Sequence, residues 1–180
     1  MKKSQLAHIL RAACEATNDP EILVIGSQAI LGSFKEGQLP KEATLSIEAD
    51  VAFLDDPEEH KSDAVDGAIG EASRFHESFG IYGQGVSIST AILPTGWQER
   101  LVAFDDPEAG ASKAVCLDPH DLVLSKLVAG RDKDYEFARA LLAAGLVRVD
   151  VLSDRAELIP GLEAIRRRVL RWIEGTASRL

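Results

Sequence analysis

The sequence predicts an α/β (α+β) fold: a small mixed sheet with flanking helices, followed by a helical C-terminal part. Short apolar runs of strand length, separated by turn residues, occur between residues 20 and 117, whereas helical spacing dominates residues 118–180. A chain of 180 residues is long enough for one domain with a core and short for two. We therefore predict a single domain over 1–180, with its sheet in 20–117 and helices in 118–180.

Composition and charge exclude several classes of protein. A hydrophobic share of 46% and a charged share of 27% are ordinary for a globular chain and exclude disordered and fibrous classes. No apolar run is long enough to span a bilayer, and Met1-Lys2-Lys3 leads into a mixed helix, so we expect a cytoplasmic protein with no membrane partner. Cys14 and Cys116 are far apart and the histidines are scattered, which argues against a disulfide framework or a structural zinc site. The net charge of −9 argues against broad nucleic-acid binding.

The first third of the chain contains a helix and two strands joined by a glycine corner. Residues 4–17 have the apolar spacing of a packing helix. The apolar run 22–25 predicts a strand that is buried on both faces. Gly26 then permits a tight turn, and Ser27 is a candidate N-cap for a short helix. The second strand carries residues 46–50.

The middle of the chain alternates helices and strands. Residues 61–80 predict one or two helices, broken near Gly70. Alternating apolar and polar residues predict a strand within 81–93. The apolar runs at 101–104 and 113–117 predict two further strands, of which the second is the last in the chain.

The C-terminal third is predicted to be helical. Asp118-Pro119 supplies an N-cap acceptor followed by proline at the first helical position, so a helix begins there, and Gly130 is a candidate for its end. A second helix runs to about Gly145. A final apolar stripe is surrounded by arginines, which form either a solvated face or a dock for RNA or an acidic partner. This stripe consists of Leu162, Ile165, Val169, Trp172 and Ile173, and the arginines are Arg166, Arg167, Arg168 and Arg171.

A candidate metal and phosphate site lies at the glycine corner. Residues two apart on a strand point to the same side, so Ser46, Glu48 and Asp50 share one face. Two carboxylates on one face repel each other, and a divalent cation relieves that repulsion. Gly26 and Ser27 can bring backbone N–H groups close to a triphosphate. We therefore predict that Glu48 and Asp50 bind Mg²⁺ beside an NTP.

Two segments resemble a known family. Gly26-Ser27 followed by Glu48-x-Asp50 resembles the active-site signature of the nucleotidyltransferase superfamily that includes DNA polymerase β, where Gly-Gly or Gly-Ser precedes Asp-x-Asp. Glu48 departs from this pattern. Residues 121–134 are similar to the Lys-Leu-x-Ala-x-Arg and Lys-Asp segment of bacterial nucleotidyltransferase-like proteins. That group is related to the toxins of type IV toxin–antitoxin and abortive-infection systems.

The resemblance implies a Mg²⁺-dependent transfer of NMP from an NTP to a hydroxyl, carried by a tRNA end, a protein side chain or a small molecule. Helical spacing alone leaves Lys126 either extending to the surface or meeting an anion, and leaves Arg131 either ion-paired or in a nucleotide pocket. The implied catalytic residues are Glu48, Asp50 and Lys126, and the implied nucleotide contacts are Gly26, Ser27, Lys126, Arg131 and Asp134.

A third carboxylate, which members of the superfamily often supply from a later strand, has no candidate within 81–93. Asp105 and Asp106 directly precede Pro107 and are typical of a turn. A second hypothesis therefore stands beside the enzyme: a non-catalytic relative that binds a nucleotide or a small partner protein, for instance as half of a toxin–antitoxin pair.

Overall fold

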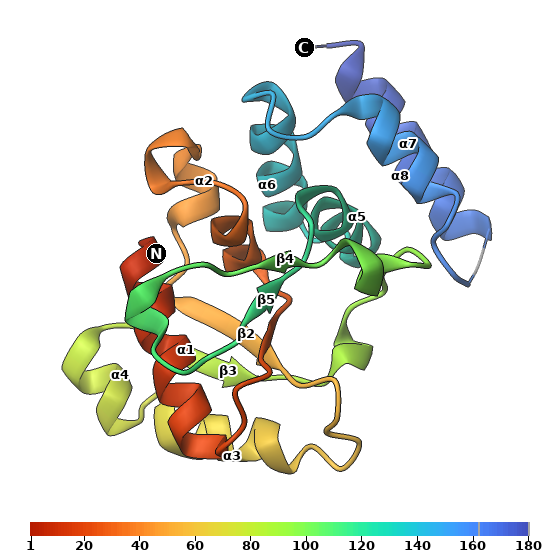
Figure 1. Cartoon of the computed structure of the whole chain (residues 1–180). Coiled ribbons are helices and arrows are strands. Elements are labelled where there is room, and N and C mark those ends of the chain that lie inside the picture. Colours follow the sequence, from red (N-terminus) through yellow and green to blue (C-terminus); the bar gives the residue numbers. More distant parts are fainter. Residues whose placement is uncertain (162, 180) are drawn as a thin grey trace.

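The computed structural model describes residues 1–161 and 163–179 and confirms the predicted fold class. The sheet is mixed and five-stranded, in the order β3-β2-β1-β5-β4, and helices lie around it (Figure 1). The strands are short, and the longest is β2. Their bounds are β1 Leu23–Val24, β2 Glu48–Ala52, β3 Tyr82–Gly85, β4 Val102–Ala103 and β5 Val115–Cys116.

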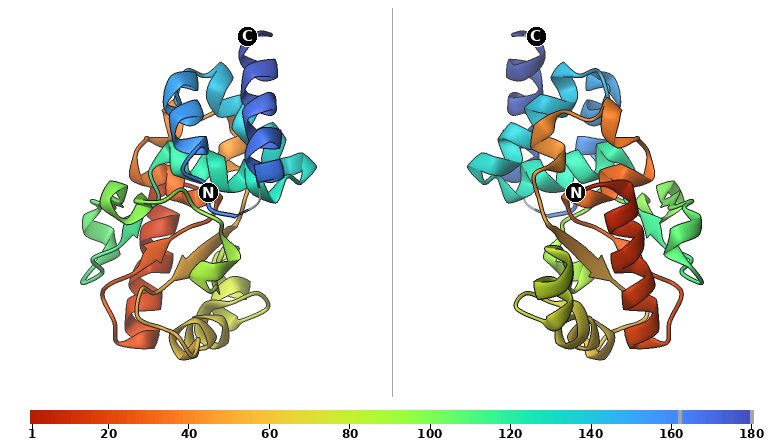
Figure 2. Two further views of the ribbon diagram at one scale, coloured as in Figure 1. Left: turned by 90° about the vertical axis from the view of Figure 1, so that its right-hand side faces the viewer. Right: turned by 90° about the vertical axis from the view of Figure 1, so that its left-hand side faces the viewer.

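The helices gather at two ends of the molecule. Helices α5 to α8 lie together at one end, whereas α1, α3 and α4 lie toward the other (Figure 2). The α-helices are α1 Lys3–Thr17, α2 Lys41–Thr44, α3 His60–Ile69, α4 Arg74–Phe79, α5 Pro119–Ala129, α6 Asp132–Ala143, α7 Val149–Ala156 and α8 Glu163–Ala177. Short 3-10 helices are η1 Ser27–Gly32, η2 Glu36–Gln38, η3 Ile88–Thr90, η4 Trp97–Arg100 and η5 Pro107–Ala109.

Sheet pairing fixes the neighbours of the two acidic residues. Strand β1 is antiparallel to β2 and parallel to β5, while β2 is parallel to β3. In this register Glu48 lies opposite Tyr82 and Asp50 lies opposite Gln84. The Ile25 N–H, just past β1, donates to the Asp50 carbonyl at 3.2 Å. The end of β1 is therefore held directly beside Asp50.

The core explains why this arrangement is rigid. Leu6, Ile9 and Leu10 of α1 are fully buried, and α1 and α3 both pack against β2 and β3. On β1, Leu23 and Val24 are also buried, as a strand with neighbours on both sides requires. The chain that enters the glycine corner is thus fixed by packing, which holds the corner in place for a ligand.

Three local predictions need correction. The strand predicted within 81–93 ends at Gly85, because the Ser87 side chain accepts the Ser89 N–H and begins η3 instead. Ser46 lies before β2 rather than on it, and its hydroxyl bonds to the Glu48 backbone. Ser27 is the first residue of η1 and does not cap it with its side chain.

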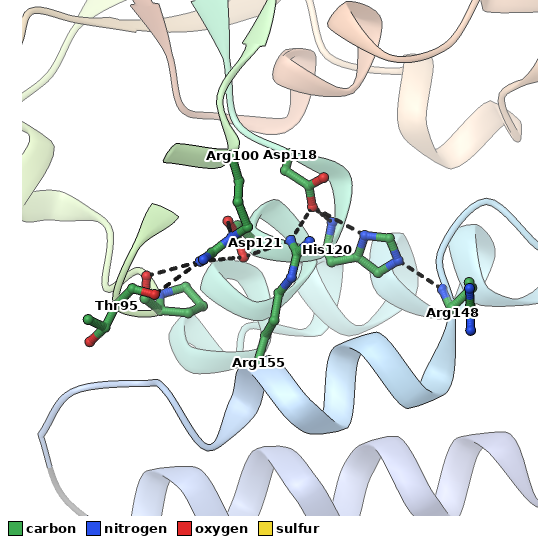
Figure 3. A network of polar contacts seen from close by, with 8 residues as sticks. Thr95, Arg100, Asp118, His120, Asp121, Arg148 and Arg155 are labelled. Carbon is green, nitrogen blue, oxygen red and sulfur yellow. Dashed lines mark hydrogen bonds and ion pairs between the residues drawn. The ribbon is translucent and has the colours of Figure 1, made fainter. Parts of the chain in front are cut away.

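A network of ion pairs joins α5 to η4 and α7 (Figure 3). We call it the structural network, formed by Arg100, Asp118, His120, Asp121 and Arg155. Asp121 is fully buried and receives hydrogen bonds from Arg100 Nε at 2.7 Å and from Arg155 Nη1 at 3.1 Å. Asp118 caps α5 by accepting the His120 N–H at 2.8 Å and also pairs with Arg155.

The C-terminal arginines contact both their own helix, α8, and the end of α5. Arg168 caps the end of α5 by donating to the Val128 carbonyl at 2.6 Å, and Arg167 pairs with Glu163. Leu162, predicted as part of the apolar stripe here, lies outside the described residues. Within 1–161 and 163–179, none of the helices combines the length and the apolarity that crossing a membrane requires.

Candidate active site

The glycine at position 26 makes room for a carboxylate. Its backbone is extended, with φ −83° and ψ −168°, so a left-handed turn does not explain the glycine. A Cβ added at Gly26 would lie 1.4 Å from Asp50 Oδ2. Any larger residue would therefore displace the Asp50 carboxylate. The sequence interpretation of Gly26 as a turn residue is corrected: close approach of Asp50 is what requires it.

Glu48 and Asp50 line the same cavity, as residues two apart on β2 should. The Tyr82 hydroxyl donates to Glu48 Oε2 at 3.1 Å from the neighbouring strand. Burial and the Glu48 carboxylate raise the pKa of Asp50 to about 6. Burial and Glu48 also raise the pKa of Tyr82 to about 12, so its phenol stays protonated and can donate. Lys126 and Arg131 act in the opposite direction on the Asp50 pKa but do not restore its ordinary value, so the repulsion within the acidic pair is only partly relieved.

Two cations stand opposite the acidic pair. Lys126 comes from the last turn of α5 and Arg131 from the residue that precedes α6. Both point toward Asp134, which is 2% exposed: Arg131 Nε donates to its Oδ2 at 2.7 Å, and Lys126 Nζ lies 3.8 Å from its Oδ1. Burial lowers the pKa of Lys126, although Asp134 and Asp50 act in the opposite direction. Asp134 therefore fixes the two cations at the wall of the cavity.

Two hollows meet at these four side chains. The smaller has a volume of about 290 Å³ and the larger about 410 Å³. Glu48, Asp50, Lys126 and Arg131 line both of them. Besides these, the smaller is lined by Ile25, Gly26, Gln84, Val86, Thr90, Ala91, Ser125 and Ala129, and the larger by Ser27, Glu42, Leu45, Ser46, Lys133, Asp134, Glu136 and Phe137.

All seven residues predicted for the site therefore lie around one cavity system. For Lys126, the structure decides between the two alternatives: it meets an anion rather than extending to the solvent. Arg131 is ion-paired with Asp134 and also lines the hollows, while its contact with a nucleotide stays a prediction. Sequence reasoning missed Tyr82 and Gln84. Only the register of β3 against β2 could have found them.

Comparison with known proteins identifies a family. The model of a family described as a nucleotidyltransferase of unknown function (DUF6036) matches residues 4–172. The chain belongs to this family. The resemblance to nucleotidyltransferases is thereby confirmed, while the relation to toxin–antitoxin systems stays a prediction. No curated protein and no solved structure gives a significant match.

A nucleotidyltransferase family implies Mg²⁺, and the acidic pair fits this ion in one particular way. Among residues 1–161 and 163–179, no group of three or more metal-ligating side chains is close enough to form a cage. Mg²⁺, however, is commonly held by one or two carboxylates together with water and substrate phosphates. The raised pKa of Asp50 marks a carboxylate whose charge a cation would stabilise. Glu48 and Asp50 therefore suit a Mg²⁺ ion that arrives with a nucleotide.

Proposed function

We propose that this chain is a Mg²⁺-dependent nucleotidyltransferase that transfers NMP from an NTP to a hydroxyl acceptor. The observation that carries the proposal is the close approach of the Asp50 carboxylate to Gly26, with Glu48 beside it and Lys126 and Arg131 opposite. The carboxylate oxygens suit Mg²⁺ and the two cations suit phosphate groups, and all four side chains line the same cavities. Phosphoryl chemistry depends mainly on such positioning and charge stabilisation.

Each side chain has a defined role in this mechanism. Glu48 and Asp50 would hold Mg²⁺, which supplies a Lewis acid that polarises the phosphates when bound. Ser27 contacts the triphosphate, and Lys126 and Arg131 stabilise the negative charge that develops as pyrophosphate leaves. An acceptor oxygen bonds to the α-phosphorus, the bond from that phosphorus to the bridging oxygen breaks, and the hydroxyl proton passes to water. Asp134 keeps the two cations in place.

One observation favours a second function, a non-catalytic module that binds a nucleotide or a small partner protein, as in a toxin–antitoxin pair. Gln84 stands in register beside Asp50 on β3 and lines the smaller hollow. An amide there can neither complete a set of acidic metal ligands nor accept a proton as a carboxylate does. Among the described residues, no third acid lies close enough to the acidic pair to form a metal-binding group with it, so the third carboxylate stays unassigned.

The test measures binding and transfer on the same proteins. Wild type, Lys126→Ala and Lys126→Arg are titrated with a non-hydrolysable NTP and Mg²⁺, and then incubated with α-labelled NTPs and cell extract. Under the enzyme hypothesis, Lys126→Ala weakens nucleotide binding about tenfold or more, since a hydrogen bond to a charged group contributes about 1.5–3 kcal/mol. Lys126→Arg keeps the charge and should retain part of the affinity.

The outcomes separate the two functions. Mg²⁺-dependent label in any acceptor, lost in Lys126→Ala, supports the enzyme. Tight Mg²⁺–NTP binding without label in any acceptor supports the binding module. If wild type binds no nucleotide with or without Mg²⁺, the proposal is wrong.

A further inference from the structure

Apart from the four side chains that line both, the two hollows have different linings, and these linings differ in charge. The residues that only the smaller hollow contains are all uncharged, and its polar ones are Gln84, Thr90 and Ser125. The larger hollow alone contains Lys133 and the Ser27 hydroxyl, together with the apolar side chains Leu45 and Phe137. The two sides of the acidic pair therefore offer different chemistry to a ligand.

The larger hollow suits the donor nucleotide. Lys133 adds a cation to those of Lys126 and Arg131, and its apolar wall can contact a base. Five acids line it against these three cations, including Glu42 and Glu136, so the lining of the hollow carries a net negative charge. A Mg²⁺ ion bound to the triphosphate reduces the repulsion between the phosphates and the acids of this hollow. We therefore predict that the nucleotide binds well only together with the cation.

The smaller hollow suits an uncharged acceptor. An anionic acceptor there would face Glu48 and Asp50 without a cation beyond the two that the donor already contacts. The Gln84 side chain is exposed and makes no hydrogen bond within the described residues, so its amide is free to donate and to accept. Hydroxyl groups both donate and accept, and thus match an amide.

Size points in the same direction. A volume of about 290 Å³ lies just below the range of about 300–1,000 Å³ for small-molecule pockets, so the compound it takes must be small. An in-line transfer also requires donor and acceptor to approach the α-phosphorus from opposite sides. The hollows share the acidic pair and the two cations but extend to different residues, so a donor and an acceptor can occupy separate cavities that meet at this pair.

We propose that the smaller hollow is the acceptor site, and that it takes a small, uncharged compound with hydroxyl groups, such as a sugar, a polyol or a nucleoside. This rests on the proposed nucleotidyl transfer. The acceptor oxygen forms a bond to the α-phosphorus, pyrophosphate leaves with the electrons of the broken bond, and the hydroxyl proton passes to water. No further oxidant, reductant or co-reactant is needed.

Two variants of exposed residues test the division of the site. Of the two hollows, Lys133→Met changes only the larger and Gln84→Leu changes only the smaller; both replacements keep the approximate shape of the side chain. Lys133→Met should raise the Kd of a non-hydrolysable Mg²⁺–NTP about threefold to fivefold. Gln84→Leu should leave that Kd within about twofold and raise the acceptor KM about fivefold to tenfold. An equal effect of both variants on the nucleotide Kd would overturn the division.

The acceptor class is tested with α-labelled NTPs, Mg²⁺ and a panel of glucose, ribose, inositol, glycerol, uridine and adenosine, beside a short RNA ending in CCA and the protein itself. Label in a neutral small compound is the expected result. Label only in RNA or protein, or in none of the neutral compounds, overturns this inference. Failure of the wild type to bind Mg²⁺–NTP in the titration would instead reject the proposed function itself.

Discussion

Charged clusters lie at both ends of helix α5, and their electrostatics are opposite. At the N-terminal end, the structural network matches its two acids, Asp118 and Asp121, with Arg100 and Arg155 (Figure 3). At the C-terminal end, Lys126 faces a cavity in which the carboxylates of Glu48 and Asp50 lie on the same side. One cluster is satisfied within the protein, and the other is not.

The pKa values express this difference. Burial alone would raise the pKa of Asp118, but hydrogen bonds from His120 and the charge of Arg155 outweigh it and lower the pKa to about 2. Burial and Glu48 raise that of Asp50 to about 6. Removing one partner from a matched buried cluster is destabilising because it leaves an uncompensated charge, whereas an unmatched cluster in a cavity is typical of a ligand site. Removing a carboxylate from the cluster at the N-terminal end of α5 should therefore lower the stability of the fold, and removing one from the cluster at the C-terminal end should raise it.

The largest expected effect is at Asp121. Asp121→Ala leaves Arg100 and Arg155 without the buried carboxylate that pairs with both, and breaking a buried pair costs about 3–5 kcal/mol. We expect the free energy of unfolding in urea to fall by about that amount. Asp154→Ala, at an exposed position of α7, is the matched control and should change it by less than about 0.5 kcal/mol. A small loss at Asp121 would remove the contrast between the two clusters.

The charge on Asp118 should make the free energy of unfolding depend on pH. Its pKa is about 2 in the folded protein and about 3.9 when unfolded, so the charged form stabilises the fold above about pH 4. That stabilisation, about 2 kcal/mol, is lost as pH falls from about 4 to 2. Asp118→Asn keeps an N-cap acceptor but removes the charge. The variant should therefore be less stable than wild type at pH 6 and nearly equal to it at pH 2, measured by urea unfolding across pH.

Asp50 should behave in the opposite way. Asp50→Asn removes one of two repelling charges without changing the shape of the side chain, so the metal-free protein should gain about 1 kcal/mol at pH 7. The stabilisation that Mg²⁺ and a non-hydrolysable NTP give to the wild type should be lost. Thermal melts with and without both ligands measure these two effects. Equal stabilisation of wild type and variant by the ligands would show that the acidic pair holds no metal.

How far the sequence could predict this site depends on how far apart in the chain the interacting residues lie. Alternation along one strand placed Glu48 and Asp50 together, because that geometry is local. For Lys126, helical spacing indicated an apolar side, and only the resemblance to a family favoured a phosphate role. The steric reason for Gly26 could not be read from the sequence, because it depends on a carboxylate from another strand.

The fold was predictable for a similar reason and to a similar extent. The α/β class and the helix that begins at Asp118 follow from local patterns, and both are confirmed. The strand predicted within 81–93 was too long, because the cap at Ser87 competes with strand pairing. Tyr82 and Gln84 depend on the parallel register of β2 and β3, and parallel pairing of strands distant in sequence leaves no local signal.

The smallest effect concerns the hydrogen bond that holds Glu48. Glutamate is one methylene longer than the aspartate of the family pattern, and Tyr82 donates to its Oε2 at 3.1 Å from the adjacent strand. Tyr82→Phe removes that donor but keeps the ring, so the free energy of unfolding should fall by no more than about 1 kcal/mol. The Kd of Mg²⁺–NTP should rise about threefold to fivefold, because the carboxylate is less well oriented. Tyr135→Phe, in which the ring stays stacked on Trp172, is the control and should leave that Kd unchanged. If both tyrosine variants bind Mg²⁺–NTP like the wild type, Tyr82 does not position Glu48, and the longer acid is held by β2 alone.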